Sequence, residues 1–188
     1  MTNDSLQPTS GSSLENTQKP GSLSVTGQRE QFLRIHILPE MTALLPIEQV
    51  AEVLTVPLGG IVPIPHTSPW VMGVYNWRGE VLWMVDLGHL CGLTPWYEQE
   101  TDSSVYEVVV LQVTVQSSTE TQSKSQTLGL VVDRVEDIEW CDWQAIQCPL
   151  NFTINSTLTQ ILRGYWWKSN DAMLAVLDGS AIFQAIPC

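Results

Sequence analysis

Two aspartates stand at matching places in this chain, each directly after an apolar, strand-like run. They are Asp86 and Asp178. Two carboxylates that share one proton can activate water for hydrolysis of a peptide bond. That chemistry uses the pattern Asp-Thr/Ser-Gly, in which the hydroxyl supports the pair, but Leu87 and Gly179 follow the aspartates here. A hydrolase that uses Asp86 and Asp178 remains an alternative, beside the simpler reading that both carboxylates accept backbone N–H bonds in turns.

Other catalytic or metal-binding groups lack the spacing that their chemistry needs. His66, His89 and Cys91 come nearest to a metal-ligand cluster, but their spacing is not that of a tetrahedral site. No serine lies in a Gly-x-Ser-x-Gly elbow, and the glycines at 59 and 60 are not followed by the Lys-Ser/Thr of a phosphate-binding loop. We therefore predict no metal and no cofactor.

A different kind of candidate is Arg78, in the short polar element of residues 76–79 between two strand-like runs. Gly73 and Gly79 permit a tight turn that would aim the arginine. Its planar guanidinium is suited to a carboxylate, and Glu52 is the obvious partner. This pair either closes a seam of the fold or belongs to a binding surface, and the residues alone leave both open.

Composition narrows the class of protein. The chain has 188 residues, 44% of them hydrophobic, with 8 Lys+Arg against 20 Asp+Glu and a net charge of -12. Such a charge repels nucleic acid, and the apolar runs are too short for insertion into a membrane. Four cysteines without a CxxC pair, and a beginning that does not resemble a secretory signal, indicate reduced thiols and a cytoplasmic protein.

The elements that must position these residues are mostly short strands. Residues 1–28 are polar and are predicted to form a flexible tail. Strands are predicted at 31–38, 71–75, 80–85, 105–115, 127–132, 165–167 and 173–177, with an enlarged loop at 116–126 and a closing helix at 180–185. Residues 47–54 suit either a helical turn or a strand. Many short strands with frequent turns predict an all-β barrel or sandwich.

A faint internal repeat suggests two related halves. Gly73-x-Tyr75, leading to Asp86, is echoed by Gly164-x-Trp166, leading to Asp178, and residues 50–53 are echoed by residues 135–138. Two small half-barrels would explain both echoes. We expect a folded domain at 29–186, with one subdomain around 40–95 and another around 104–180.

In order and spacing, the motifs resemble the CheW family of chemotaxis coupling proteins. The likeness runs from about Gln31 to Phe183. It rests on Leu45-Pro46-Ile47-x-x-Val50-x-Glu52-Val53, then Gly73-x-x-Asn76-x-Arg78-Gly79, then Gly129-Leu130-Val131-Val132-Asp133. The resemblance implies two five-stranded β-barrel subdomains of the SH3 or OB type with short helical segments, and no catalysis.

The resemblance also implies partners and site residues. Members of the family bridge the cytoplasmic tip of a chemoreceptor and the regulatory domain of a CheA-type histidine kinase. Carried over by position, Glu52 and Arg78 would pair at the receptor-binding groove, a set completed by Val50, Asn76, Val108 and Gly129. Ile47 and Gly73 would lie near the kinase-binding surface. A groove between barrels suits an amphipathic helical tip.

Several positions depart from the family pattern. Trp77 stands where leucine is usual before the arginine, and Trp83-Met84 stands where Leu/Val-Pro is common. The polar tail and the 116–126 loop are additions. These changes would suit a pathway other than flagellar chemotaxis, such as pilus-based motility or phototaxis. Within the same fold, the alternative function is a regulator or decoy that binds one partner.

Overall fold

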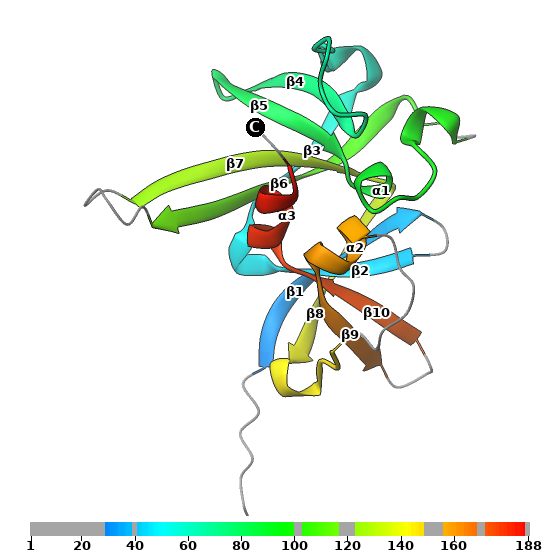
Figure 1. The fold of residues 1–188 in the computed structure, drawn as a ribbon, viewed down its shortest axis with the longest axis vertical. Helices are drawn as coiled ribbons and strands as arrows, with labels where there is room; N and C mark the ends of the chain where they lie inside the picture. Colours follow the sequence, from blue (N-terminus) through cyan, green and yellow to red (C-terminus); the bar gives the residue numbers. More distant parts are fainter. Residues whose placement is uncertain are drawn as a thin grey trace, which may run out of the picture.

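The computed structural model describes residues 29–38, 41–99, 103–116, 123–148, 156–168 and 172–186. Within these ranges the chain forms two five-stranded sheets, with short helices at the strand ends (Figure 1). The predicted all-β fold of two small subdomains is confirmed. The predicted tail at 1–28 lies outside the described residues.

One sheet, which we call barrel A, begins with the first strand. Its order is β8 (Arg134–Asp142), β1 (Arg29–Leu38), β2 (Met41–Pro46), β10 (Ala172–Leu177) and β9 (Leu162–Lys168). Alternation along β1 sends Phe32 into the interior of barrel A and Leu33 and Ile35 toward the second sheet. In the middle of β1, residues on both faces are therefore buried and apolar.

The other sheet, barrel B, contains the central part of the chain. Its order is β3 (Val50–Pro57), β6 (Val105–Gln116), β7 (Ser123–Val132), β5 (Glu80–Asp86) and β4 (Val71–Trp77). On β6, Val108 and Val110 face the interior of barrel B, whereas Val109 and Leu111 face barrel A. This explains the unbroken apolar run 108–111, which is typical of a strand buried on both faces.

The internal repeat corresponds to a structural duplication. In each sheet a hairpin, β4–β5 or β9–β10, joins the rest through a parallel pair, β5 with β7 or β10 with β2. Near the start of each hairpin a glycine lies against a backbone carbonyl: Gly73 against that of Val62, and Gly164 against that of Gln147. A Cβ atom at either glycine would overlap the carbonyl oxygen. The two halves thus share strand order and a required glycine.

The expected subdomains around 40–95 and around 104–180 do not match the sheets. Barrel B is built from residues 50–132, and barrel A takes β1 and β2 from before this segment and β8, β9 and β10 from after it. The physical reason is the parallel pairing of β2 with β10, which draws together strands from opposite ends of the described chain. Hairpin patterns alone do not reveal such a pairing.

Several predicted segments can be compared with the structure. Residues 47–54, left open between helix and strand, contain both: the 3-10 helix η1 (Ile47–Gln49) and the start of β3. Strands β6 and β7 extend into the predicted 116–126 loop, and residues 117–122 lie outside the described ranges. The closing helix is α3 (Gly179–Ala185).

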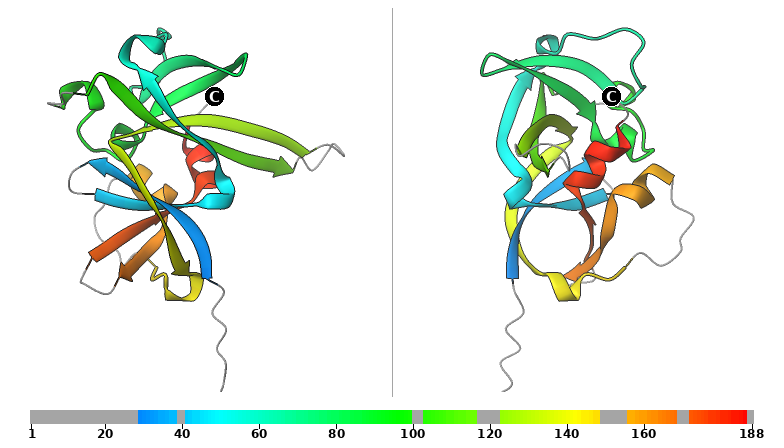
Figure 2. Two further views of the ribbon diagram at one scale, coloured as in Figure 1. Left: turned by 180° about the vertical axis from the view of Figure 1, so that it is seen from behind. Right: turned by 60° about the vertical axis from the view of Figure 1, so that its left-hand side comes forward.

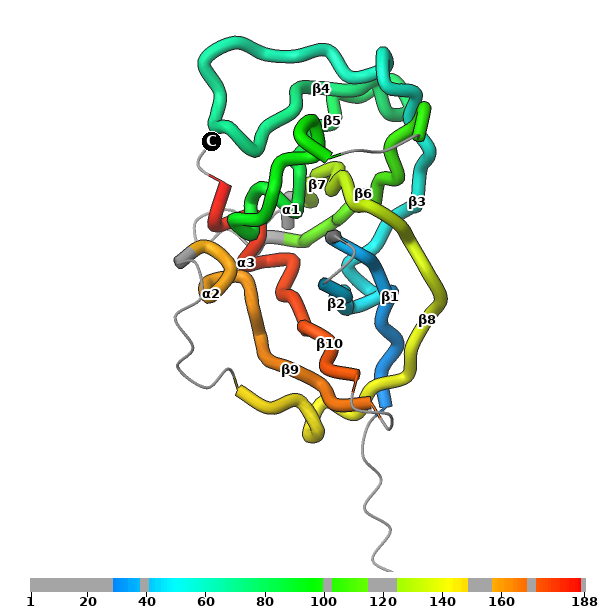
Figure 3. The backbone as a smooth tube through the Cα atoms, turned by 90° about the vertical axis from the view of Figure 1, so that its right-hand side faces the viewer, coloured from blue at the N-terminus to red at the C-terminus, as the bar shows by residue number. Residues whose placement is uncertain are grey.

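The remaining short helices lie between successive strands. They are α1 (Leu87–Leu90), α2 (Ser156–Ile161), and the 3-10 helices η2 (Leu58–Gly60), η3 (Trp96–Glu98) and η4 (Trp143–Ala145). Helices α1, α2 and α3 gather on one side of the molecule, and β3 and β8 run along the opposite side (Figures 2 and 3). The largest core cluster lies between the sheets and includes Leu87, Ile161 and Ile182 from these helices.

In the described part of the chain, no helix is long and apolar enough to cross a bilayer.

Candidate functional site

The site is built on the tight turn between β4 and β5. Trp77 pairs with Glu80, so two residues form the turn, and both have positive φ: 55° at Arg78 and 88° at Gly79. Two left-handed residues in a two-residue hairpin are typical of a type I′ turn, where glycine and asparagine are favoured. The Asn76 side-chain oxygen accepts a hydrogen bond from the Gly79 N–H at 3.0 Å and fixes the turn. A non-glycine residue held in this backbone region often marks a functional constraint.

Arg78 and Glu52 are brought together across the open seam of barrel B, between its edge strands β3 and β4. Nη2 of Arg78 lies 2.8 Å from Oε2 of Glu52. The indole Nε1–H of Trp77 donates to the same oxygen at 2.9 Å, and the guanidinium carbon of Arg78 lies 5.2 Å from the centroid of the Trp77 ring. The arginine side chain is 69% exposed and the glutamate 31%. An exposed pair of this kind adds little to stability, and it leaves the Arg78 guanidinium accessible to solvent.

Three other residues of the expected receptor groove occupy different environments. Val50 is half-buried and packs against the core between the barrels. Val108 is fully buried inside barrel B, and a Cβ at Gly129 would lie 2.6 Å from the sulfur of Met84, also in that interior. Val108 and Gly129 therefore do not line a surface groove, contrary to the expectation, because they are on the inner face of barrel B.

The two residues expected near the kinase are also only partly accessible. Ile47, in η1, is half-buried against the core. Gly73 is buried and has φ of 139°, a region that glycine adopts freely. Gly73 lets the segment before β4 approach closely, so that Val62 pairs with Val74 and keeps a side chain that is 60% exposed. Gly73 thus affects the surface indirectly, by allowing Val62 to lie beside β4 with an exposed side chain.

The two aspartates considered for hydrolysis cap helices in separate halves. Asp86, 5% exposed, accepts hydrogen bonds from the backbone N–H groups of His89 and Trp96 at 3.0 and 2.7 Å. Asp178 accepts from Ser180 and Ala181 at 2.9 and 3.3 Å. No hydrogen bond joins the two carboxylates in the described residues. Their geometry is that of helix caps, in accord with the simpler reading of the sequence.

The histidines and the cysteine considered for metal binding are not assembled into a site. Within the ranges that the structure describes, no group of three or more His, Cys, Asp or Glu side chains is placed to hold a metal ion. Cys91 is buried, and burial, with a smaller contribution from the charge of Asp86, raises the pKa of its thiol to about 12. A neutral, buried thiol is a poor nucleophile and a poor ligand.

A second ionic network lies on barrel A at the seam between its edge strands β8 and β9. Lys168 donates to Glu139 at 2.5 Å, and Arg34 contacts Glu139 at 2.7 Å and also Glu136. Partial burial opposes ionisation of Glu136, but the hydrogen bonds and charges of His36 and Arg34 outweigh it and lower its pKa. Sequence reasoning missed this network, because its partners are far apart in the chain and meet only once the strand order is known.

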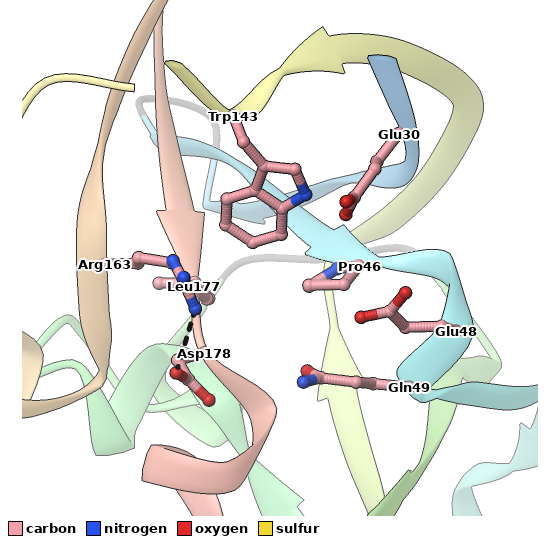
Figure 4. A pocket seen from close by; sticks show the side chains of 8 residues that line it. All are labelled: Glu30, Pro46, Glu48, Gln49, Trp143, Arg163, Leu177 and Asp178. Carbon is pink, nitrogen blue, oxygen red and sulfur yellow. Dashed lines mark ion pairs between the residues drawn. The ribbon is translucent and has the colours of Figure 1, made fainter. Parts of the chain in front are cut away.

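A surface pocket of about 380 Å³ was also missed (Figure 4). Its lining residues come from the ends of several strands: Glu30, Pro46, Glu48, Gln49, Trp143, Arg163, Leu177 and Asp178. Arg163 stacks on Trp143, with its guanidinium carbon 4.1 Å from the ring centroid, and lies 3.6 Å from Asp178. The pocket has an acidic rim and an aromatic wall, and contains no nucleophile paired with a base.

Comparisons with known proteins agree with the fold. The model of the CheW-like domain family matches residues 33–186. A curated relative, "Chemotaxis protein CheW" of Rhizobium meliloti (strain 1021), is 34% identical over 76 residues, and the match spans 40% of each chain. The crystal structure of the scaffolding protein TtCheW from Thermoanaerobacter tengcongensis superposes with a TM-score of 0.62 at 22% identity, covering 80% of this chain and 89% of that one.

The chain therefore belongs to the CheW-like family. The shared architecture is two five-stranded barrels, and the Glu52–Arg78 pair lies on the second of them.

Proposed function

We propose that this protein is a non-enzymatic cytoplasmic adaptor that couples a chemoreceptor to a CheA-type histidine kinase. The observation that carries the proposal is the Glu52–Arg78 pair, held on a strained turn with an arginine side chain that is 69% exposed. In a chain with a net charge of -12, an arginine kept in an unfavourable backbone conformation and left largely in water is better explained by a partner than by folding.

The receptor would bind through the helical tip of its cytoplasmic domain. Arg78 and Glu52 supply the polar contacts, Asn76 fixes the turn, and the half-buried Val50 offers an apolar contact on the same strand as Glu52. Val108 and Gly129, which lie in the interior of barrel B, are not part of this surface.

The kinase would meet a different part of barrel B. Val62 and Val81 expose 60% and 69% of their side chains on two segments that pair with β4, and Val62 owes its position to Gly73. Exposed apolar residues that gather on one face are typical of protein interfaces. Ile47, half-buried in η1, would contribute at the edge of this surface or support it from below.

The test is binding of the purified protein to two probes from the same cell: the cytoplasmic tip of a chemoreceptor and the regulatory domain of a CheA-type kinase. Binding to both, with Arg78→Ala weakening only the receptor contact, supports the coupling role. Binding to the kinase or the receptor alone favours the single-partner regulator of the same fold. The bulky Trp77 beside the arginine would suit a receptor of a pilus-based or phototactic pathway, and panels of receptor tips from such pathways would distinguish these.

A further inference from the structure

We propose that Trp77 is a positioning residue of the receptor surface, and that this surface recognises a side-chain carboxamide, an asparagine or glutamine, on the bound helical tip. This inference rests on the proposed function and specifies the chemistry of the partner at the same site. It depends on which atoms of Glu52 and Arg78 are already engaged.

The two oxygens of Glu52 are in different states. Oε2 receives both protein donors, Nη2 of Arg78 at 2.8 Å and Nε1 of Trp77 at 2.9 Å. Oε1 receives no hydrogen bond from any described residue, and the glutamate side chain is 31% exposed. An ionised carboxylate has acceptor sites on both oxygens, so Oε1 is available to a donor from outside.

Arg78 also retains unused capacity. Its guanidinium has five N–H donors, and one nitrogen contacts Glu52. The ring of Trp77 lies 5.2 Å from the guanidinium carbon, within the range of cation–π attraction. Because Trp77 contacts both charged groups at once, and itself packs against the barrel B core, it holds them in a fixed relation.

The resulting surface has a free acceptor beside free donors. Because Glu52 and Arg78 carry opposite charges, a carboxylate, ammonium or guanidinium on the partner is attracted by one of them and repelled by the other, and gains little net Coulombic energy. A primary carboxamide carries an N–H₂ donor and a carbonyl acceptor side by side, and can satisfy Oε1 and Arg78 together. The N–H and C=O of a trans peptide group point in opposite directions, so the main chain of the partner cannot do the same.

The role of Trp77 can be separated from simple packing. Trp77→Phe keeps an aromatic ring over the core but removes the Nε1–H, so Glu52 is less firmly held. We expect receptor-tip binding to weaken about three- to tenfold, the usual effect of one lost hydrogen bond, with a small decrease in the unfolding midpoint that Trp83→Phe should match. Trp83→Phe is the matched control, since Trp83 is 44% exposed on the adjacent strand and, among the described residues, has no hydrogen bond or cation–π contact with Glu52 or Arg78.

The partner chemistry is tested by exchanging groups across the interface. The probe is the cytoplasmic hairpin of a chemoreceptor from the same cell, in which each asparagine or glutamine at the tip is changed in turn to the matching acid. One such change should weaken binding to the native protein at least tenfold. Glu52→Gln, which replaces an acceptor by a donor, should then bind that acidic tip better than the native tip.

The possible outcomes distinguish failure of the proposed function from failure of this inference. If the native protein binds no receptor tip, the proposed coupling function falls, and this inference falls with it. If the tip binds and Arg78→Ala weakens it, but no amide-to-acid change alters the affinity, the carboxamide is refuted while the coupling function stands. If Trp77→Phe and Trp83→Phe bind equally well, Trp77 is not a positioning residue.

Discussion

Replacing Arg78 by glycine separates its contribution to binding from its contribution to folding. Arg78 has φ of 55°, a left-handed conformation that costs a side-chain-bearing residue roughly 1–2 kcal/mol. Glycine adopts this conformation freely but loses about 0.5–1 kcal/mol through the greater freedom of the unfolded chain. The exposed ion pair with Glu52 contributes at most about 1 kcal/mol. These effects nearly cancel, so the free energy of unfolding should change by less than about 1 kcal/mol.

Binding should respond very differently. A hydrogen bond that involves a charged group is worth about 1.5–3 kcal/mol, which corresponds to a ten- to hundredfold loss of affinity for the receptor tip. Unfolding would be followed by tryptophan fluorescence in urea, and affinity by calorimetry with the receptor hairpin. Arg134→Gly is the matched control, because Arg134 is 59% exposed on barrel A. A loss of stability above about 2 kcal/mol, or unaltered affinity, would refute the assignment of Arg78 to a binding surface.

Three further predictions concern the fold. Gly73→Ala should destabilise the protein by more than about 3 kcal/mol, since its Cβ would overlap a backbone carbonyl. Gly129→Ala would place its Cβ against a flexible methionine side chain and should cost only about 1–3 kcal/mol. Comparable urea midpoints for the two variants would contradict this order. The pKa of Glu136 is lowered in the folded state, so ionised Glu136 stabilises the fold above its usual pKa of 4.5, and this stabilisation is lost as the pH falls below that value. The unfolding free energy of Glu136→Gln should therefore depend less steeply on pH than that of the native protein. Parallel plots of unfolding free energy against pH for the two proteins would count against the network. At pH 8 iodoacetamide should label the exposed Cys148 and should not label Cys91, because the Cys91 thiol is buried and its pKa is raised. Mass spectrometry of tryptic peptides would identify the labelled cysteines. Rapid labelling of Cys91 would show that its burial is not maintained.

Much of the fold could be predicted from local patterns. Alternation and turn residues located most strands, and the positive-φ turn at Arg78 follows from the polar residues between β4 and β5. The matching aspartates at the ends of β5 and β10 marked the duplication. Each of these signals lies within a few residues of the structure that it predicts.

What failed was the assignment of faces and of distant partners. Val108 lies in a run of valines in which alternate residues enter two different cores, and alternation cannot tell an inner face from an outer one when both are buried. Gly129 suggested an open groove floor, but its lack of a side chain accommodates Met84 inside barrel B. The bond from Trp77 to Glu52 and the network around Glu139 cross the seams between edge strands, and such contacts follow from sheet order, which hairpin patterns do not supply.

The insertion of barrel B between β2 and β8 has a consequence for the order in which the chain folds during synthesis. All strands of barrel B fall within residues 50–132, so this half can close as soon as that segment has left the ribosome. Until β10 emerges, β2 pairs with β1 alone, and the apolar surface that barrel A shares with barrel B is incompletely covered. The nascent chain therefore passes through a half-folded stage with an unpaired strand edge, at which a chaperone would bind. A circularly permuted chain in which β8, β9 and β10 precede β1 and β2 would make the strands of barrel A continuous in sequence and would remove that stage.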